Sequence, residues 1–147
     1  MTVRRFEDLV VGDRLDCGTV TASKADMIAF AEQYDPLGMH VDEAAARDSP
    51  FGGLIASGIH TFALTQPPVV EHLYRDSMLV ASAGMQELRF PAPLRPNDEL
   101  HVTVDILDKR PAERSPDRGV LTTRRQATVD GTTVLDLEND TVWLRDG

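Results

Sequence analysis

The chain has 147 residues, of which 41% are hydrophobic and 27% charged, a composition typical of a globular protein. Its length suits a single compact domain over residues 1–147. The formal net charge of −9 argues against a nucleic-acid partner or an anionic membrane surface, because phosphates are bound by clustered Lys and Arg side chains.

No segment has the features of a membrane helix or a signal peptide. The sequence lacks an apolar run of the roughly 20 residues that cross a bilayer, and no apolar run follows its basic N-terminal residues. Cys17 is the only cysteine, so an internal disulfide is excluded and the cytoplasm is the expected compartment. A passive position in a first strand is the simplest assignment for this thiol.

Basic side chains gather in the second half of the chain. The negative net charge does not exclude an anionic ligand such as coenzyme A, because local patches of positive charge decide whether an anion binds. Most of these side chains are nevertheless expected on solvated strand faces and loops: Arg89, Arg95, Lys109, Arg110, Arg114, Arg118, Arg124 and Arg125.

The first part of the chain is predicted to be a strand followed by two helices. Residues 13–21 are expected to form the strand. Ser23 is a good N-cap, and the apolar residues after it have helical spacing, which predicts a helix at about 23–34. Asp42 is the expected cap of a short helix at about 42–47.

Residues 35–40 separate these two helices and are not expected to be regular helix. Pro36 disfavours helical geometry at Asp35, and Gly38 loosens the chain. A second loop is expected at 49–53.

A long apolar stretch from Leu54 to about Tyr74 predicts a deeply buried helix, because its apolar residues show little sidedness. Pro67 and Pro68 lie inside this stretch. An interior proline removes a backbone hydrogen bond and clashes with the preceding turn, so the helix is expected to end, kink or restart there.

The second half is predicted to be β-strand, since Val, Thr and Leu recur with partial alternation. Asp130 and Gly131 form a strong two-residue hairpin signal. A turn is expected at 91–98 and a polar loop at 110–119, between strands at 79–90, 99–109, 120–129 and 133–144. One early strand, a buried helix and four late strands predict an α+β fold in which an antiparallel sheet wraps around the helix.

Asp35 and His40 lie on the irregular segment ahead of the buried helix. A carboxylate and an imidazole held close together can activate a water molecule. The same residues also fit a role without chemistry, in which Asp35 caps a turn and His40 is a polar loop residue. Spacing alone does not decide between these roles.

Ser57 and Gly58 lie near the start of the buried helix. First-turn N–H groups lack internal partners and sit at the positive end of the helix dipole, so they can polarise a substrate carbonyl. A glycine also lets a ligand approach the backbone closely. Close helix packing or a simple cap explains the pair equally well. His60 is more simply a core or interface histidine than a site residue.

Two segments resemble the signature of the MaoC-like family, which includes (R)-specific enoyl-CoA hydratases. They are FAEQYDPLGMHVD at 30–42 and SPFGGLIASGIHT at 49–61. The family motif places an Asp five residues before a His and, further along, a Gly at the N-terminus of the central helix of a hot-dog fold. Asp35, His40 and Gly58 fall on these positions. The strand end and turn at 88–98 resemble the family more loosely.

The resemblance implies a hydratase or dehydratase that acts on a 2-enoyl or 3-hydroxyacyl thioester of coenzyme A or an acyl carrier protein. Asp35 would be the general base that takes a proton from water, and His40 would hold that water and help deliver the proton to the α-carbon. The N–H group of Gly58 would stabilise the enolate-like oxygen, with Ser57 lining the same pocket. No cofactor is implied, and no metal, because no close pair of histidine ligands is present.

Sites in this family lie at or near a subunit interface, so a homodimer or a multiple of it is expected. The chain differs from the common family pattern at Leu37 and Gly38, where Asn and Pro are common, and at Ser57, where His is common. A hot-dog acyl thioesterase and a non-catalytic acyl-binding subunit are the alternative functions. The spacing of Asp35 and His40 favours the hydratase.

Overall fold

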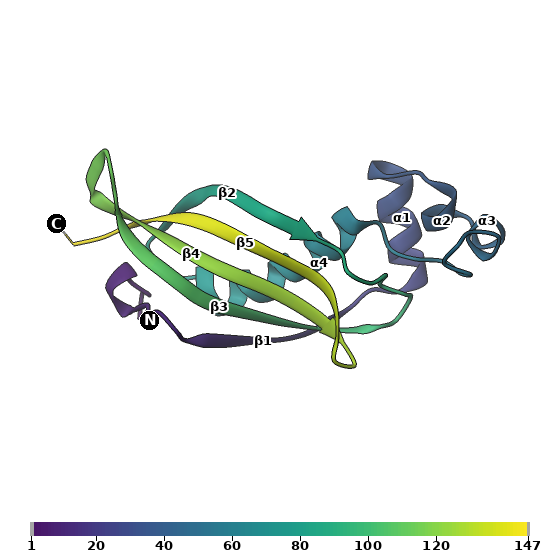
Figure 1. Cartoon of the computed structure of the whole chain (residues 1–147), viewed down its shortest axis with the longest axis horizontal. Coiled ribbons are helices and arrows are strands. Elements are labelled where there is room, and N and C mark those ends of the chain that lie inside the picture. Colours follow the sequence, from purple (N-terminus) through teal and green to yellow (C-terminus); the bar gives the residue numbers. More distant parts are fainter. Residues whose placement is uncertain (1, 147) are drawn as a thin grey trace.

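A computed structural model describes residues 2–146 and contains a curved, five-stranded antiparallel sheet with a helix running along it (Figure 1). The strand order is β1-β3-β4-β5-β2. The strands are β1 (Arg14–Thr21), β2 (Leu79–Arg89), β3 (Glu99–Ala112), β4 (Ser115–Val129) and β5 (Thr132–Leu144). This α+β arrangement is the hot-dog fold, which confirms the fold predicted from the sequence.

Three short helices lie together beyond one end of the sheet (Figure 1): α1 (Lys24–Tyr34), α2 (Gly38–Val41) and α3 (Glu43–Arg47). Local chemistry explains where two of them begin. The hydroxyl of Ser23 accepts the N–H of Asp26 at 3.1 Å, as expected of an N-cap. Asp42 likewise accepts first-turn N–H groups of α3. A single 3₁₀ turn, η1 (Phe6–Asp8), precedes β1.

The central helix is shorter than the apolar stretch that predicts it. Helix α4 covers Gly58–Val69, and a π-helical turn, η2 (Val70–Tyr74), follows it directly. Pro67 and Pro68 lie within the last turns of α4 and have no N–H to donate, so the regular hydrogen-bond ladder is interrupted before η2. The expected interruption of the helix at these prolines is confirmed.

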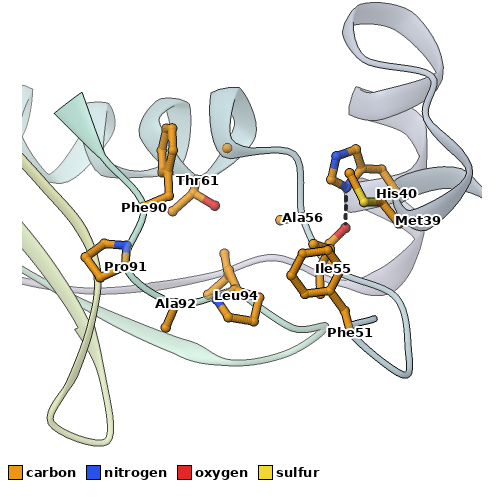
Figure 2. A pocket seen from close by; sticks show the side chains of 12 residues that line it. Met39, His40, Phe51, Ile55, Ala56, Thr61, Phe90, Pro91, Ala92 and Leu94 are labelled. Atoms are coloured by element: carbon orange, nitrogen blue, oxygen red, sulfur yellow. Dashed lines mark hydrogen bonds between the residues drawn. The ribbon is translucent and has the colours of Figure 1, made fainter. Parts of the chain in front are cut away.

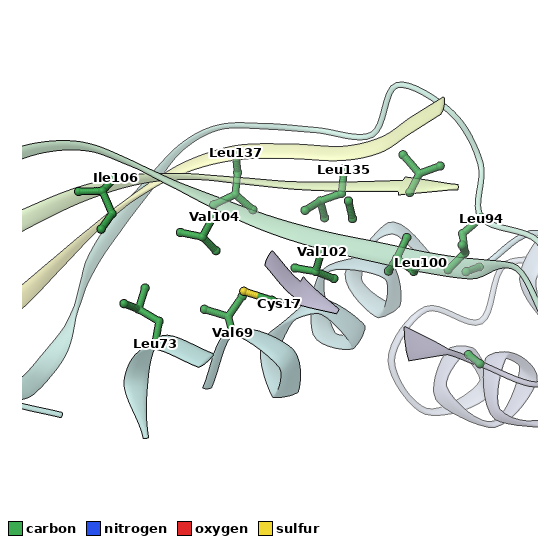
Figure 3. Packing of buried hydrophobic residues seen from close by; sticks show 14 of the residues in the cluster. Cys17, Val69, Leu73, Leu94, Leu100, Val102, Val104, Ile106, Leu135 and Leu137 are labelled. Carbon is green, nitrogen blue, oxygen red and sulfur yellow. The ribbon is translucent and has the colours of Figure 1, made fainter. Parts of the chain in front are cut away.

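One side of α4 and η2 packs against the concave face of the sheet. Figure 3 shows the aliphatic side chains of β3 and β5 facing Val69 and Leu73, with the buried Cys17 between them. Full burial of such a side chain stabilises the fold by about 1.5–3 kcal/mol. The other side of α4 is open in the single chain, where Ile59 is 56% exposed. The prediction of deep burial therefore holds for one side of the helix only.

The predicted polar loop at 110–119 is wrong. β3 and β4 continue through this segment as a hairpin, in which Pro111 pairs with Gly119 and the register shifts directly after Pro111. A proline cannot donate to the ladder, and such an irregularity is where a strand tolerates it. The other hairpin is confirmed, since Asp130 and Gly131 both have positive φ, as a type I′ turn requires.

Arg125 departs from the expected solvated faces, because it is buried at 2% exposure while its neighbour Arg124 is exposed. Within residues 2–146 no helix is both long and apolar enough to span a bilayer.

Candidate active site

Asp35 and His40 lie on either side of the short connection between α1 and α2, with Asp35 at its start and His40 in the helical turn that follows it. Asp35 is the C-cap of α1. His40 lies inside the single turn of α2, so the expectation that it lies outside helix is wrong. A Cβ at Gly38 would lie 3.1 Å from the Cβ of Ala45, which shows how closely this turn packs on α3. The side chain of Leu37 is exposed, and its carbonyl oxygen accepts a hydrogen bond from the N–H of His40.

The imidazole of His40 is buried and held in one orientation. Its Nδ1 lies 2.9 Å from the carbonyl oxygen of Ile55 (Figure 2). A carbonyl only accepts hydrogen bonds, so Nδ1 carries a proton and Nε2 of the neutral ring presents a lone pair. That Nε2 lies 3.6 Å from Oδ2 of Asp35.

The carboxylate of Asp35 receives a hydrogen bond from a fully buried hydroxyl. Ser57 Oγ donates to Asp35 Oδ2 at 2.6 Å. An ionised carboxylate and a neutral Nε2 both accept hydrogen bonds, so one water molecule beside Asp35 and His40, within reach of both, can donate to each. The group is therefore arranged to hold a water molecule beside a base.

The N-terminus of α4 adjoins this group and has no side-chain cap. Ser57 occupies the N-cap position, but its hydroxyl is directed to Asp35. The first-turn N–H groups of α4 therefore donate no hydrogen bond to the N-cap side chain, and they lie at the positive end of the helix dipole. A Cβ at Gly58 would lie 2.8 Å from the ring of Phe90, so any other residue here requires the ring or the helix start to move.

A largely apolar cavity of about 360 Å³ lies in front of this helix start (Figure 2). His40 and Gly58 line it, whereas Asp35 and Ser57 do not and lie next to it through their contacts with His40 and Gly58. Its other walls are Met39, Phe51, Ile55, Ala56, Thr61, Phe90, Pro91, Ala92, Pro93 and Leu94. An apolar cavity with a few convergent polar groups is typical of a small-molecule site.

Phe90 also belongs to the site, although its position in the sequence gave no sign of this. It appeared only as the end of a strand, and its approach to Gly58 depends on how the segment after β2 lies against α4. The carbonyl of Ile55, which sets the tautomer of His40, was missed as well, because a backbone acceptor leaves no trace in residue type.

His60 does not line the cavity, in agreement with its assignment to the core. The ring is buried and stacks on Phe30 with the centroids 4.4 Å apart, and its Nδ1 has no hydrogen-bond partner among residues 2–146. Burial lowers the pKa of His60, which favours the neutral ring.

Comparison with known proteins adds the following matches. Residues 9–128 match the sequence profile of the family described as MaoC like domain. The uncharacterised protein YdeM of Bacillus subtilis is 34% identical over 118 residues, which are 80% of this chain and 82% of YdeM. A 3-hydroxybutyryl-CoA dehydratase of Methylorubrum extorquens is 32% identical over 115 residues, which are 78% of this chain and 71% of the dehydratase. The crystal structure of a MaoC-like dehydratase from Rhodospirillum rubrum has a TM-score of 0.86 at 39% identity, and the match covers 96% of this chain and 97% of that one.

Proposed function

Because this chain belongs to the MaoC-like domain family, we propose that it adds water to 2-enoyl thioesters, or removes water from 3-hydroxyacyl thioesters. One observation carries the proposal. The lone pair of His40 Nε2 and the carboxylate of Asp35 lie 3.6 Å apart, beside a helix N-terminus that has no side-chain cap. The name of the Methylorubrum relative, a 3-hydroxybutyryl-CoA dehydratase, supports a coenzyme A thioester as substrate.

Hydration would use the three groups in sequence. Asp35 and His40 hold a water molecule, and Asp35 takes one of its protons as the hydroxyl oxygen bonds to C3 of the enoyl chain. The C2=C3 electron pair moves toward the thioester oxygen, where the N–H of Gly58 stabilises the developing charge. The proton held by the Asp35–His40 pair then passes to C2, so that one water has been added across the double bond. Dehydration follows the same steps in reverse.

The assay that tests this proposal records loss of the alkene and cleavage of the thioester at the same time. Crotonyl-CoA and longer 2-enoyl-CoA substrates are supplied, with absorbance of the conjugated thioester and free thiol recorded in parallel, and an enoyl acyl carrier protein is run as a second carrier. Loss of the conjugated absorbance without release of thiol is the expected result. Thiol release with the alkene intact would instead identify a hot-dog thioesterase. Binding of enoyl-CoA with neither reaction would identify a non-catalytic acyl-binding subunit.

The proposed assembly is a homodimer that pairs through β2. The sheet ends at β1 and β2, and the two edges differ in character. The exposed residues of β1 are polar, whereas β2 and the residue after it expose Val80, Met85, Leu88 and Phe90. An exposed apolar edge strand gains most from pairing with a second copy. Sedimentation should therefore give a dimer for the wild type and a monomer for Leu88→Lys, and a monomeric wild type would contradict this assembly.

A further inference from the structure

A second cavity contains a buried cation without a carboxylate partner. Arg125 on β4 is 2% exposed, and its hydrogen bonds run from Nη1 to the neutral oxygens of Thr65, at 3.1 Å, and Gln66, at 2.9 Å. No Asp or Glu among residues 2–146 forms an ion pair with it. A guanidinium remains charged inside a protein, and a buried charge without a counter-ion is strongly unfavourable.

Burial lowers the pKa of Arg125. The groups that act in the opposite direction are the hydroxyl of Tyr74 and the thiol of Cys17, and neither is a carboxylate. This environment provides polar contacts to the guanidinium but no compensating negative charge.

Two other arginines of the same protein show how this side chain holds a carboxylate. Arg14 donates from Nε and Nη2 to the two oxygens of Asp105. Arg124 uses the same edge on Asp136, at 2.9 and 2.7 Å. In Arg125 the hydrogen bonds to Thr65 and Gln66 both come from Nη1, and no carboxylate of residues 2–146 is bonded to the edge formed by Nε and Nη2. That edge has the geometry for two parallel hydrogen bonds to an anion.

The guanidinium forms part of the wall of a cavity of about 250 Å³ between α4, η2 and the sheet. The other lining residues are Phe62, Gln66, Tyr74, Leu79, Ser82, Met85, Asn139 and Thr141. Part of the polar lining is already ordered, since Ser82 donates to Asn139 at 3.1 Å and Asn139 donates to Tyr74 at 3.3 Å. The apolar lining suits a hydrocarbon portion, which favours an organic acid over a bare inorganic anion.

We propose that this cavity binds the carboxylate of a small organic acid through Nε and Nη2 of Arg125. The carboxylate belongs either to a free acid or to the far end of an acyl chain. Thr61 lines the first cavity and its neighbour Phe62 lines the second, so both cavities adjoin the same stretch of α4. The proposal rests on Arg125 and its surroundings and is independent of the hydratase activity.

Binding is tested without turnover, with butyrate, hexanoate and succinate as probes and neutral butyramide as the matched control. Calorimetric titration of the wild type should detect at least one of the acids and not butyramide. Arg125→Met should weaken that binding by about tenfold or more, because a hydrogen-bonded charge pair is lost. Arg124→Met is the control variant and should bind as the wild type does, since Arg124 already holds Asp136.

Thermal melting of the ligand-free variants shows whether a loss of binding is caused by a loss of folding. Replacing an uncompensated buried charge with a side chain of similar size should leave Arg125→Met at least as stable as the wild type. Arg125→Lys keeps the charge but lacks the planar fork, so it should also bind the acid less well. The proposal is overturned if the wild type binds none of the acids, or if Arg125→Met binds them as tightly as the wild type does. It is also overturned if Arg125→Met is destabilised and the wild type binds butyramide as tightly as it binds the acids.

Kinetics then separate the two sources of the carboxylate. The substrates are 2-hexenoyl-CoA and the same chain ending in a carboxylate. A higher KM of Arg125→Met for the carboxylate-ended substrate alone would assign the cavity to the end of the acyl chain. Unchanged KM values for both, with binding of the free acids lost, would assign it to a separate organic acid. Absence of hydration by the wild type would count against the proposed function and leave the binding result standing.

Discussion

The two cavities along α4 differ in the surroundings of their charged side chains. At the helix N-terminus, the carboxylate of Asp35 accepts a hydrogen bond from the hydroxyl of Ser57 and faces Nε2 of His40. Beside the second cavity, Arg125 donates hydrogen bonds to two neutral oxygens and lies over the ring of Phe62, with no carboxylate partner among residues 2–146. The carboxylate of the first group is partly exposed to solvent, whereas the guanidinium of the second is buried without an anionic partner among residues 2–146. Substitutions in the two groups should therefore have separable consequences.

The largest effect is expected at the first cavity. Asp35→Asn keeps the shape of the side chain but removes the base, so hydration of crotonyl-CoA should fall by about 10²-fold or more, and His40→Ala should cause a similar loss. The double variant should lose much less than the product of the two, because both residues act on one water molecule. Steady-state kinetics with circular dichroism as a folding control measure this. Wild-type rates for Asp35→Asn would end the proposed mechanism.

Gly58→Ala should have the next largest effect. The added Cβ would lie 2.8 Å from the ring of Phe90, so either the ring or the helix start must move. Displacement of the N–H that faces the substrate should lower kcat by up to about 10²-fold. Phe90→Leu removes the clashing ring atoms, so the double variant should regain part of the lost rate. A fully active Gly58→Ala would show that the backbone here is not part of the site.

Ser57→Ala should have a smaller effect on the same group. It removes one hydrogen bond to a carboxylate, and such bonds contribute about 1.5–3 kcal/mol. If part of this energy serves to position Asp35, kcat should fall by roughly tenfold with KM little changed. An unchanged kcat would reduce the role of Ser57 to packing.

The smallest effect is expected on the stability of the fold, and it should distinguish the neighbouring residues Arg124 and Arg125. Arg124 lowers the pKa of Asp136 by a hydrogen bond, so this pair stabilises the fold above the ordinary pKa of an Asp and ceases to do so as the pH falls through the lowered value. Arg124→Met should therefore lower stability by no more than about 1 kcal/mol near pH 7, and the difference from the wild type should disappear in acid. Arg125→Met should show no such acid dependence, because no carboxylate of residues 2–146 pairs with it. Chemical unfolding at several pH values tests both.

Much of the first cavity follows from a short stretch of sequence. Asp35, His40, Ser57 and Gly58 lie within 24 consecutive residues, and caps, prolines and glycines determine how that stretch turns. The tautomer of His40 could not be predicted, because it depends on the carbonyl of Ile55, and any residue type provides a carbonyl.

The sequence by itself determined the helix caps, the interruption at Pro67 and Pro68, the Asp130–Gly131 hairpin and the order of elements, because each depends on chemistry between near neighbours along the chain. Only the tertiary structure decided that Phe90 covers Gly58 and that Arg125 is buried beside a cavity while Arg124 is exposed. Adjacent residues on a strand point to opposite faces, so which of two neighbouring arginines enters the core depends on the register with which distant strands pair across the sheet.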